Sequence, residues 1–425
     1  MPARSSSGLL AQCDASARAD DVEIHPPAGD WQPWLVQQGT GAYFRVGADV
    51  AWLLGELDGQ RSVSQLAADL GTPWTPQTVK AAVSAFAAHG WLADGRLPRR
   101  RPHRLTYVRP LTLQLTLFDP SRLLGRVRSA LAWLTSPAAV LLPALGALSS
   151  VGVVLTHRSE IAPAMRQLPT PGAALAAAVA VLVSIVAHEF GHAAMLTAHG
   201  GRPRRMGLML FYGLPAAFCD VSDGWRLPRR GQRVAVALAG VATEITLAGA
   251  AALTAVCLPA GQVRTVLLVY TLGCLVRSLF NLMPFARLDG YLALMSALDL
   301  THLRDKAMRD AQRAVGRLLF GGTYRRELPQ LCWALPYGAA CQLFPVGMLT
   351  YAIWTWAGRR LVISETALHL VVTTLAVLLA ARLLMILRGA HAEACAAGTT
   401  PRRRQGVTAA LAAVIACLPA ILWAT

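Results

Sequence analysis

Two histidines and a glutamate lie close together in the run His188-Glu189-Phe190-Gly191-His192, inside an otherwise apolar stretch. Residues four apart lie on one face of a helix, so the two imidazoles could bind one Zn²⁺ together. Glu189 lies about a quarter-turn away, within reach of a water at that metal. Histidines and carboxylates are costly to bury in a membrane span, so they are usually retained there for function. The spacing therefore predicts a zinc peptidase motif rather than three unrelated helical side chains.

The composition describes a polytopic membrane protein. Of the 425 residues, 54% are hydrophobic and only 15% are charged. The net charge of +17 comes from arginines that cluster beside apolar stretches, where an excess of Lys and Arg marks the cytoplasmic side. We therefore expect no nucleic-acid partner. The eight cysteines contain no C-x-x-C pair, which argues against a disulfide framework.

Seven apolar stretches are each near the length that crosses a bilayer. They cover roughly residues 130–155, 173–198, 233–257, 264–283, 334–357, 362–387 and 407–424. We predict a mainly α-helical bundle of about six or seven spans in the cell (plasma) membrane, with the lipid bilayer as a partner. Arg359-Arg360 would fall in a short outer turn, so the fifth and sixth spans could be re-entrant or differently bounded.

The opening segment Met1 to Asp21 is polar and lacks the apolar core of a cleavable signal peptide. We therefore expect the N-terminal region and the catalytic motifs to face the cytoplasm. The predicted organisation is a disordered N-terminus (1–20), a small α+β domain (21–98), a basic linker (99–128) and a transmembrane domain (129–425).

Short β-prone runs at 22–25, 34–37 and 43–46 precede helical patterns within the α+β domain. The segment Gly41 to Leu57, the Asp58-Gly59 turn and Val63 to Leu66 resemble the PqqD-like peptide-recognition domain. That resemblance implies a winged-helix-like fold that binds a leader peptide as an added strand, a mode that needs an open sheet edge.

A catalytic zinc generally keeps three protein ligands, so the histidine pair needs a third. The best candidate is Asp289, in the run from Asn281 to Gly290, because the fourth predicted span ends there at the same face as the histidines. Asp289 could instead cap a turn with Gly290. Asn281 could simply end a helix ahead of Pro284.

Taken together, these motifs resemble the site-2 protease family of intramembrane zinc metalloproteases over roughly residues 173–298. The matching positions are His188, Glu189, His192, Asn281, Pro284, Leu288, Asp289 and Gly290. The resemblance implies that His188, His192 and Asp289 bind Zn²⁺, that Glu189 is the general base, and that Asn281 helps to hold the substrate strand or the oxyanion.

Other polar residues of the membrane region carry weaker signals. Glu244 and Arg277 lie in neighbouring predicted spans, and we favour a structural ion pair over catalysis. His369 fits a packed helix residue. Cys219, Asp220 and Asp223 fall between the two motif halves, where a solvated loop is the default expectation.

The chain has a PqqD-like front end and no PDZ insert, which favours the peptide-maturation branch of the family. The leading hypothesis is removal of the leader from a ribosomally synthesised modified peptide, such as a daptide-like product. The alternatives are regulated proteolysis of a membrane-anchored regulator and a non-catalytic membrane scaffold for peptide export. The expected partner is a precursor or membrane-anchored peptide, with an export transporter or peptide-modifying enzymes beside it.

Overall fold

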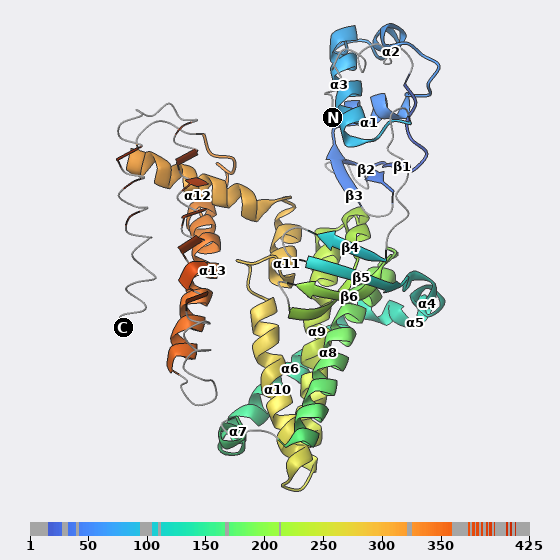
Figure 1. Cartoon of the computed structure of the whole chain (residues 1–425). Coiled ribbons are helices and arrows are strands. Elements are labelled where there is room, and N and C mark those ends of the chain that lie inside the picture. The colour runs from blue at the N-terminus through green and yellow to red at the C-terminus, as the bar shows by residue number, and fades with distance from the viewer. Residues whose placement is uncertain are drawn as a thin grey trace. The chain divides into compact units, whose positions relative to one another are not determined.

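The computed structural model describes residues 16–27, 33–39, 42–93, 104–108, 112–165, 170–211, 214–320 and 325–358, with single residues and short pieces between 373 and 413. The chain divides into two compact units, residues 1–282 and 283–425. The first unit holds a small N-terminal domain, a second sheet and a bundle of long helices (Figure 1).

The N-terminal domain combines an antiparallel sheet with three helices. Its strands β1 (Val22–His25), β2 (Trp34–Gln38) and β3 (Ala42–Val46) pair in the order β1-β2-β3. The helices are α1 (Ala48–Gly55), α2 (Val63–Leu70) and α3 (Pro76–His89). Ser62 and Thr75 open α2 and α3 with capping boxes, which satisfy backbone N–H groups at the helix starts. These elements follow the predicted runs closely.

Residues 16–20, part of the segment predicted to be disordered, contact this domain. Ala17 and Arg18 form isolated bridges to Asp58 and Leu92. The Ala19 amide donates to the Trp91 carbonyl at 2.9 Å. Residues 16–19 carry no periodic hydrophobic pattern from which this fold could be predicted. Backbone hydrogen bonds to distant loops hold them in place instead.

The chain forms a second, four-stranded antiparallel sheet, and two of its strands lie within the predicted basic linker. Its strands pair in the order β4-β5-β6-β7. They are β4 (Leu105–Val108), β5 (Thr112–Phe118), β6 (Met206–Phe211) and β7 (Leu214–Cys219). Strands β4 and β5 fall within 99–128, and the alternation in Thr112-Leu113-Gln114-Leu115-Thr116-Leu117 is the strand signal for β5.

Short helices lead from this sheet into the bundle. They are α4 (Ser121–Arg126), α5 (Arg128–Leu131), η1 (Ala132–Thr135) and η2 (Pro137–Val140). The bundle consists of α6 (Leu141–Thr156), α7 (Arg158–Ala164), α8 (Pro171–Ala198), α9 (Arg230–Cys257) and α10 (Gln262–Asn281).

Among the described residues, four helical segments are long and apolar enough to cross a membrane: Pro137–Thr156, Pro171–Ala198, Arg230–Cys257 and Gln262–Asn281. They overlap the first four predicted spans. The first begins later than expected, because residues 121–135 form the short helices instead.

Small residues bring the long helices of the bundle into close contact. A Cβ atom added at Gly249 of α9 would lie 2.4 Å from the Cα atom of Gly146 in α6. One added at Gly191 of α8 would lie 2.8 Å from the Ala239 carbonyl oxygen of α9. Such contacts favour helix association in lipid, where apolar side chains gain little from leaving the acyl chains. Helix α9 therefore lies against both α6 and α8 with almost no side chain between the backbones.

The second unit contains α11 (Asp289–Leu298), α12 (Leu303–Phe320) and α13 (Ala334–Gly358). Asp310 of α12 is fully buried and accepts hydrogen bonds from the backbone amides of Glu327 and Leu328. Helix α13 covers the residues of the fifth predicted span but is not among the four described helices that are apolar enough to cross a membrane. The sixth and seventh predicted spans, and His369, lie largely or wholly outside the described residues.

Candidate metal centre

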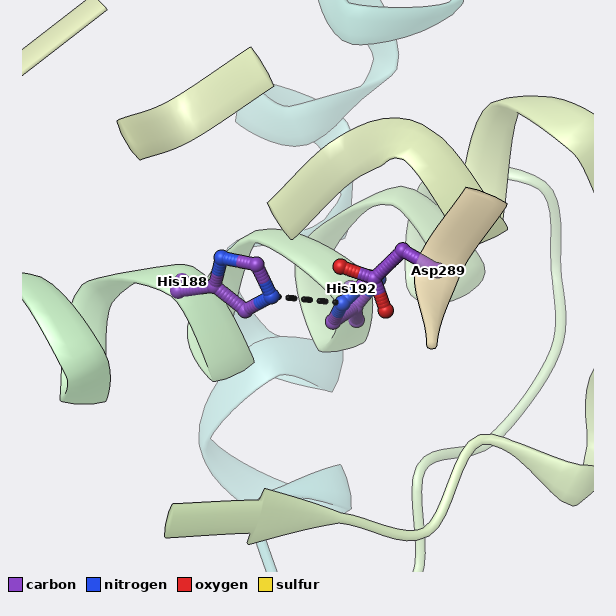
Figure 2. Close-up of side chains that lie close together, drawn as sticks. All are labelled: His188, His192 and Asp289. Atoms are coloured by element: carbon purple, nitrogen blue, oxygen red, sulfur yellow. Dashed lines mark hydrogen bonds between the residues drawn. The ribbon is translucent and has the colours of Figure 1, made fainter. Parts of the chain in front are cut away.

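His188 and His192 lie one turn apart on α8 and face each other. Both side chains are buried, and their Nε2 atoms are 3.2 Å apart (Figure 2). Nδ1 of His192 lies 2.7 Å from the Val236 carbonyl oxygen of α9. Because a carbonyl only accepts, Nδ1 carries the proton, and the Nε2 lone pair of His192 points toward His188.

Helix α9 provides a glycine at the point where the two imidazoles meet. A Cβ atom at Gly240 would lie 2.4 Å from Nε2 of both His188 and His192. No larger residue fits there without displacing the histidines. The glycine thus keeps open the space beside the two nitrogen atoms that zinc would use.

The donor set fits zinc. Two nitrogens that bind Zn²⁺ tetrahedrally at about 2.05 Å lie about 3.3 Å apart, close to the observed 3.2 Å between the two Nε2 atoms. Imidazole nitrogens and a carboxylate oxygen are ordinary zinc ligands. The pair is therefore arranged as a chelate.

A buried charged group lies behind His188. The Glu244 side chain, on α9, is fully buried, and its Oε2 atom lies 3.4 Å from Nδ1 of His188. Its Oε1 atom accepts a hydrogen bond from Nε of Arg277 at 2.5 Å, and Arg277 also donates to Oγ of Ser184 at 2.6 Å. The expected Glu244–Arg277 ion pair is confirmed, and it touches a predicted metal ligand.

Glu189 is half-buried on α8 and lies near the end of β7. Burial raises the pKa of the Cys219 thiol, and the nearby Glu189 and Asp220 carboxylates raise it further. A raised pKa keeps this thiol neutral, so Cys219 is a poor nucleophile or metal ligand.

The third predicted ligand, Asp289, is the first residue of α11. Ligand atoms of His188, His192 and Asp289 lie within 4.8 Å of one another, and Figure 2 draws the three side chains. No other such group of three His, Cys, Asp or Glu residues occurs in the part of the chain that the structure describes. Asn281 is the last residue of α10, so its expected contact with substrate stays a prediction.

The loop that contains Asp223 is not the solvated loop that the sequence predicts. Asp223 is buried in η3 (Ser222–Arg226) and accepts hydrogen bonds from the Tyr43 hydroxyl at 2.6 Å and from the Arg202 amide at 2.8 Å. The Arg45 guanidinium lies 5.3 Å from the ring centre of Trp225. Strand β3 of the N-terminal domain thus contacts the segment that joins β7 to α9, and these contacts remove Asp223 from water.

The sequence indicated Glu244 only as an ion-pair partner of Arg277, and it did not indicate Val236 and Gly240, which also surround the histidines. Val236, Gly240 and Glu244 recur every four residues and so share one face of the helix. This spacing of a glycine and a buried carboxylate was the available signal. It became informative only once α9 was known to pack on α8.

A comparison with known protein families matches the helix that carries the histidine pair. Residues 176–273 match the sequence profile of Peptidase family M50. The match covers α9, most of α8 and the first part of α10, and it ends before Asn281 and Asp289. No curated protein and no solved structure was similar enough to match the chain. The match to this peptidase family indicates a metalloprotease of the site-2 protease type.

Proposed function

We propose that this chain is an intramembrane zinc metallopeptidase that cuts a precursor peptide during maturation of a ribosomally made product. The observation that carries the proposal is the pair of buried imidazoles whose Nε2 atoms face each other at 3.2 Å beside Gly240, next to Glu189 on the same helix. The match to Peptidase family M50 over these helices supports the same chemistry.

His188, His192 and Asp289 would hold the metal. Zn²⁺ bound there would supply Lewis-acid activation of water and of the scissile carbonyl. Glu189 would take a proton from the attacking water and return it to the leaving amine. Hydrogen bonding of His192 to the Val236 carbonyl keeps its imidazole in the ligating tautomer.

An apolar groove beside α8 supports a substrate with an apolar segment. The groove has a volume of about 560 Å³ and is lined entirely by apolar residues of α8 and the four-stranded sheet. On α8 the lining includes Ala178, Leu182 and Ile185, and Glu189 follows on the same helical stripe. An apolar stretch of peptide in this groove would lead directly to the general base.

The N-terminal domain is the proposed capture site for the precursor. Strands β1 and β3 each pair only with β2 among the described residues, so each presents an edge to which an extended peptide could add. Contact of β3 with η3 connects this domain to the loop before α9. Binding at the front domain would then raise the local concentration of the cleavable segment.

Mass spectrometry of a co-expressed candidate precursor tests this proposal. Glu189→Gln keeps the size of the side chain but removes the base, so cleavage should fall by about 10²- to 10⁴-fold while zinc stays bound. Glu160→Gln, whose carboxylate pairs with Arg264 away from the histidines, is the matched control and should cleave normally.

A truncated peptide with wild type and with the control, but not with Glu189→Gln, would establish a maturation protease and locate its cut. An intact precursor in all three, together with truncation of a single-span membrane regulator, would replace peptide maturation by regulated proteolysis. A zinc-loaded protein that cuts neither the precursor nor the membrane regulator would favour the non-catalytic scaffold for peptide export.

A further inference from the structure

Glu244 is a fully buried charge beside His188, and the proposed hydrolysis gives it no step. Its side chain is fully buried in α9, eight residues after Val236 and four after Gly240. Residues at this spacing share a helix face. The face that supplies the carbonyl for His192 and the open space beside both imidazoles therefore also supplies a carboxylate.

The two oxygens of Glu244 have different surroundings. Oε1 accepts from Arg277 at 2.5 Å, and Arg277 is held in turn by Ser184, one turn before His188 on α8. Oε2 makes no hydrogen bond with other described residues and lies 3.4 Å from Nδ1 of His188. A buried carboxylate oxygen needs a donor, and the ring N–H of His188 is within reach.

The contact determines which nitrogen of His188 can bind a metal. A carboxylate accepts, so it favours the tautomer with the proton on Nδ1, as the Val236 carbonyl does for His192. Both Nε2 atoms then present lone pairs toward each other at 3.2 Å. A contact of this length needs a proton on one of the two nitrogens or a cation between them, and Zn²⁺ would supply that cation.

We propose that Glu244 is a positioning residue for the metal centre: it accepts a hydrogen bond from Nδ1 of His188, while Arg277 and Ser184 hold its carboxylate in place. This inference rests on the proposed zinc site. Carboxylate partners of ligating histidines raise ligand basicity and fix the ring orientation. The ion pair between α9 and α10 is thus part of the metal centre as well as a helix contact.

Zinc affinity, measured by competition with a chromophoric chelator on the full chain in detergent, provides the test. The key variant is Glu244→Gln/Arg277→Met, which removes both charges and so leaves no unpaired ion in the membrane region. If Glu244 orients His188, zinc affinity should fall by about 10- to 100-fold. The visible spectrum of the Co²⁺-substituted protein should change as well, because it reports the ligand geometry.

The matched control is Glu160→Gln/Arg264→Met. This variant removes a similar pair, with contacts of 2.8 and 3.1 Å, that links α7 to the start of α10 away from the histidines. Its zinc affinity should change by less than about twofold, as expected for a site with no shared partners.

A second variant covers the case in which the double variant does not fold. Glu244→Asp retains the charge opposite the long Arg277 side chain but withdraws the carboxylate from His188 by one methylene. It should also bind zinc more weakly than wild type. Wild-type affinity and an unchanged Co²⁺ spectrum in Glu244→Gln/Arg277→Met or in Glu244→Asp would overturn the role of Glu244. Failure of the wild type itself to bind zinc would instead overturn the proposed metal site.

Discussion

The N-terminal domain and the helix bundle are held together in opposite ways. In the domain, large apolar side chains such as Leu53, Leu54 and Val79 are almost completely buried. In the bundle, large apolar side chains such as Leu175 of α8 point outward and are 66% exposed, whereas glycines and polar groups lie inside. The first arrangement is driven by release of water, and the second by close packing and hydrogen bonding in lipid.

This contrast explains why the buried polar side chains of the candidate metal centre lie in the bundle. A water-driven core excludes polar groups, because burial costs free energy unless they are paired. The bundle contains His188, His192, Glu244 and Ser184 in its interior, each within reach of a partner from another residue. Such an interior is stable only while the partners fit, so it should respond to different perturbations from those that affect the domain.

Zinc binding should produce the largest difference in stability between the helix bundle and the N-terminal domain. Zinc at 1,000 times its Kd should stabilise the bundle by about 4 kcal/mol, because only the folded site binds it. The N-terminal domain lacks the site and should gain nothing. Hydrogen exchange of α8 and α9, compared with that of residues 16–93, measures both in one sample with and without a chelator. Equal protection of the two regions by zinc would contradict a binding site confined to the bundle.

Truncation of a large apolar side chain should destabilise the N-terminal domain more than the helix bundle. Leu53→Ala should destabilise the N-terminal domain by about 3 kcal/mol, since it leaves a cavity in a water-driven core. Leu175→Ala is its matched control in the bundle and should cost far less, because Leu175 faces the lipid side. Hydrogen exchange of the domain should accelerate for Leu53→Ala while the affinity for zinc stays unchanged. A loss of zinc affinity in Leu53→Ala would show that the regions are not separable.

Addition of a single methyl group should damage the bundle where the domain would tolerate it. Gly240→Ala places a carbon atom 2.4 Å from both Nε2 atoms, so zinc affinity should fall by about 100-fold. Gly273→Ala in α10 is the control, because its added Cβ meets nothing within 4 Å. It should bind zinc normally and gain up to about 1 kcal/mol in stability from its higher helix propensity. Equal zinc affinities in the two variants would contradict the close approach of α9 to the histidines.

The smallest effect is expected at the contact between the regions. Tyr43→Phe removes the hydroxyl that donates to Asp223 at 2.6 Å, which should cost about 1 kcal/mol. The Arg202 amide and Arg226 still donate to this carboxylate, so its burial is retained. Hydrogen exchange over residues 222–226 should become about fivefold faster in the variant. Unchanged exchange there would mean that the N-terminal domain does not hold this loop.

Local patterns were enough to predict much of this structure. The strands and capped helices of the N-terminal domain follow hydrophobic periodicity and turn residues, and four apolar helices follow composition. His188, Glu189 and His192 follow from helix spacing alone. Each of these features is specified by residues within about two turns of one another.

The rest depends on contacts between distant segments. Strand β5 pairs with β4 and with β6, almost a hundred residues later, and its alternating pattern was masked by adjacent arginines. Glu244 reaches His188 across 56 positions, and Gly240 is explained only by two imidazoles on another helix. No local periodicity encodes such contacts, because they arise from the packing of α8 on α9.

The most direct test of the metal site is the zinc content of purified wild-type protein and of a His188→Ala/His192→Ala variant prepared in parallel. If the two histidines bind Zn²⁺, the wild type should carry one zinc per chain and the variant none, with both proteins retaining their helical content. Equal zinc content in the two proteins, or a wild type that takes up no zinc after dialysis against the metal, would contradict it.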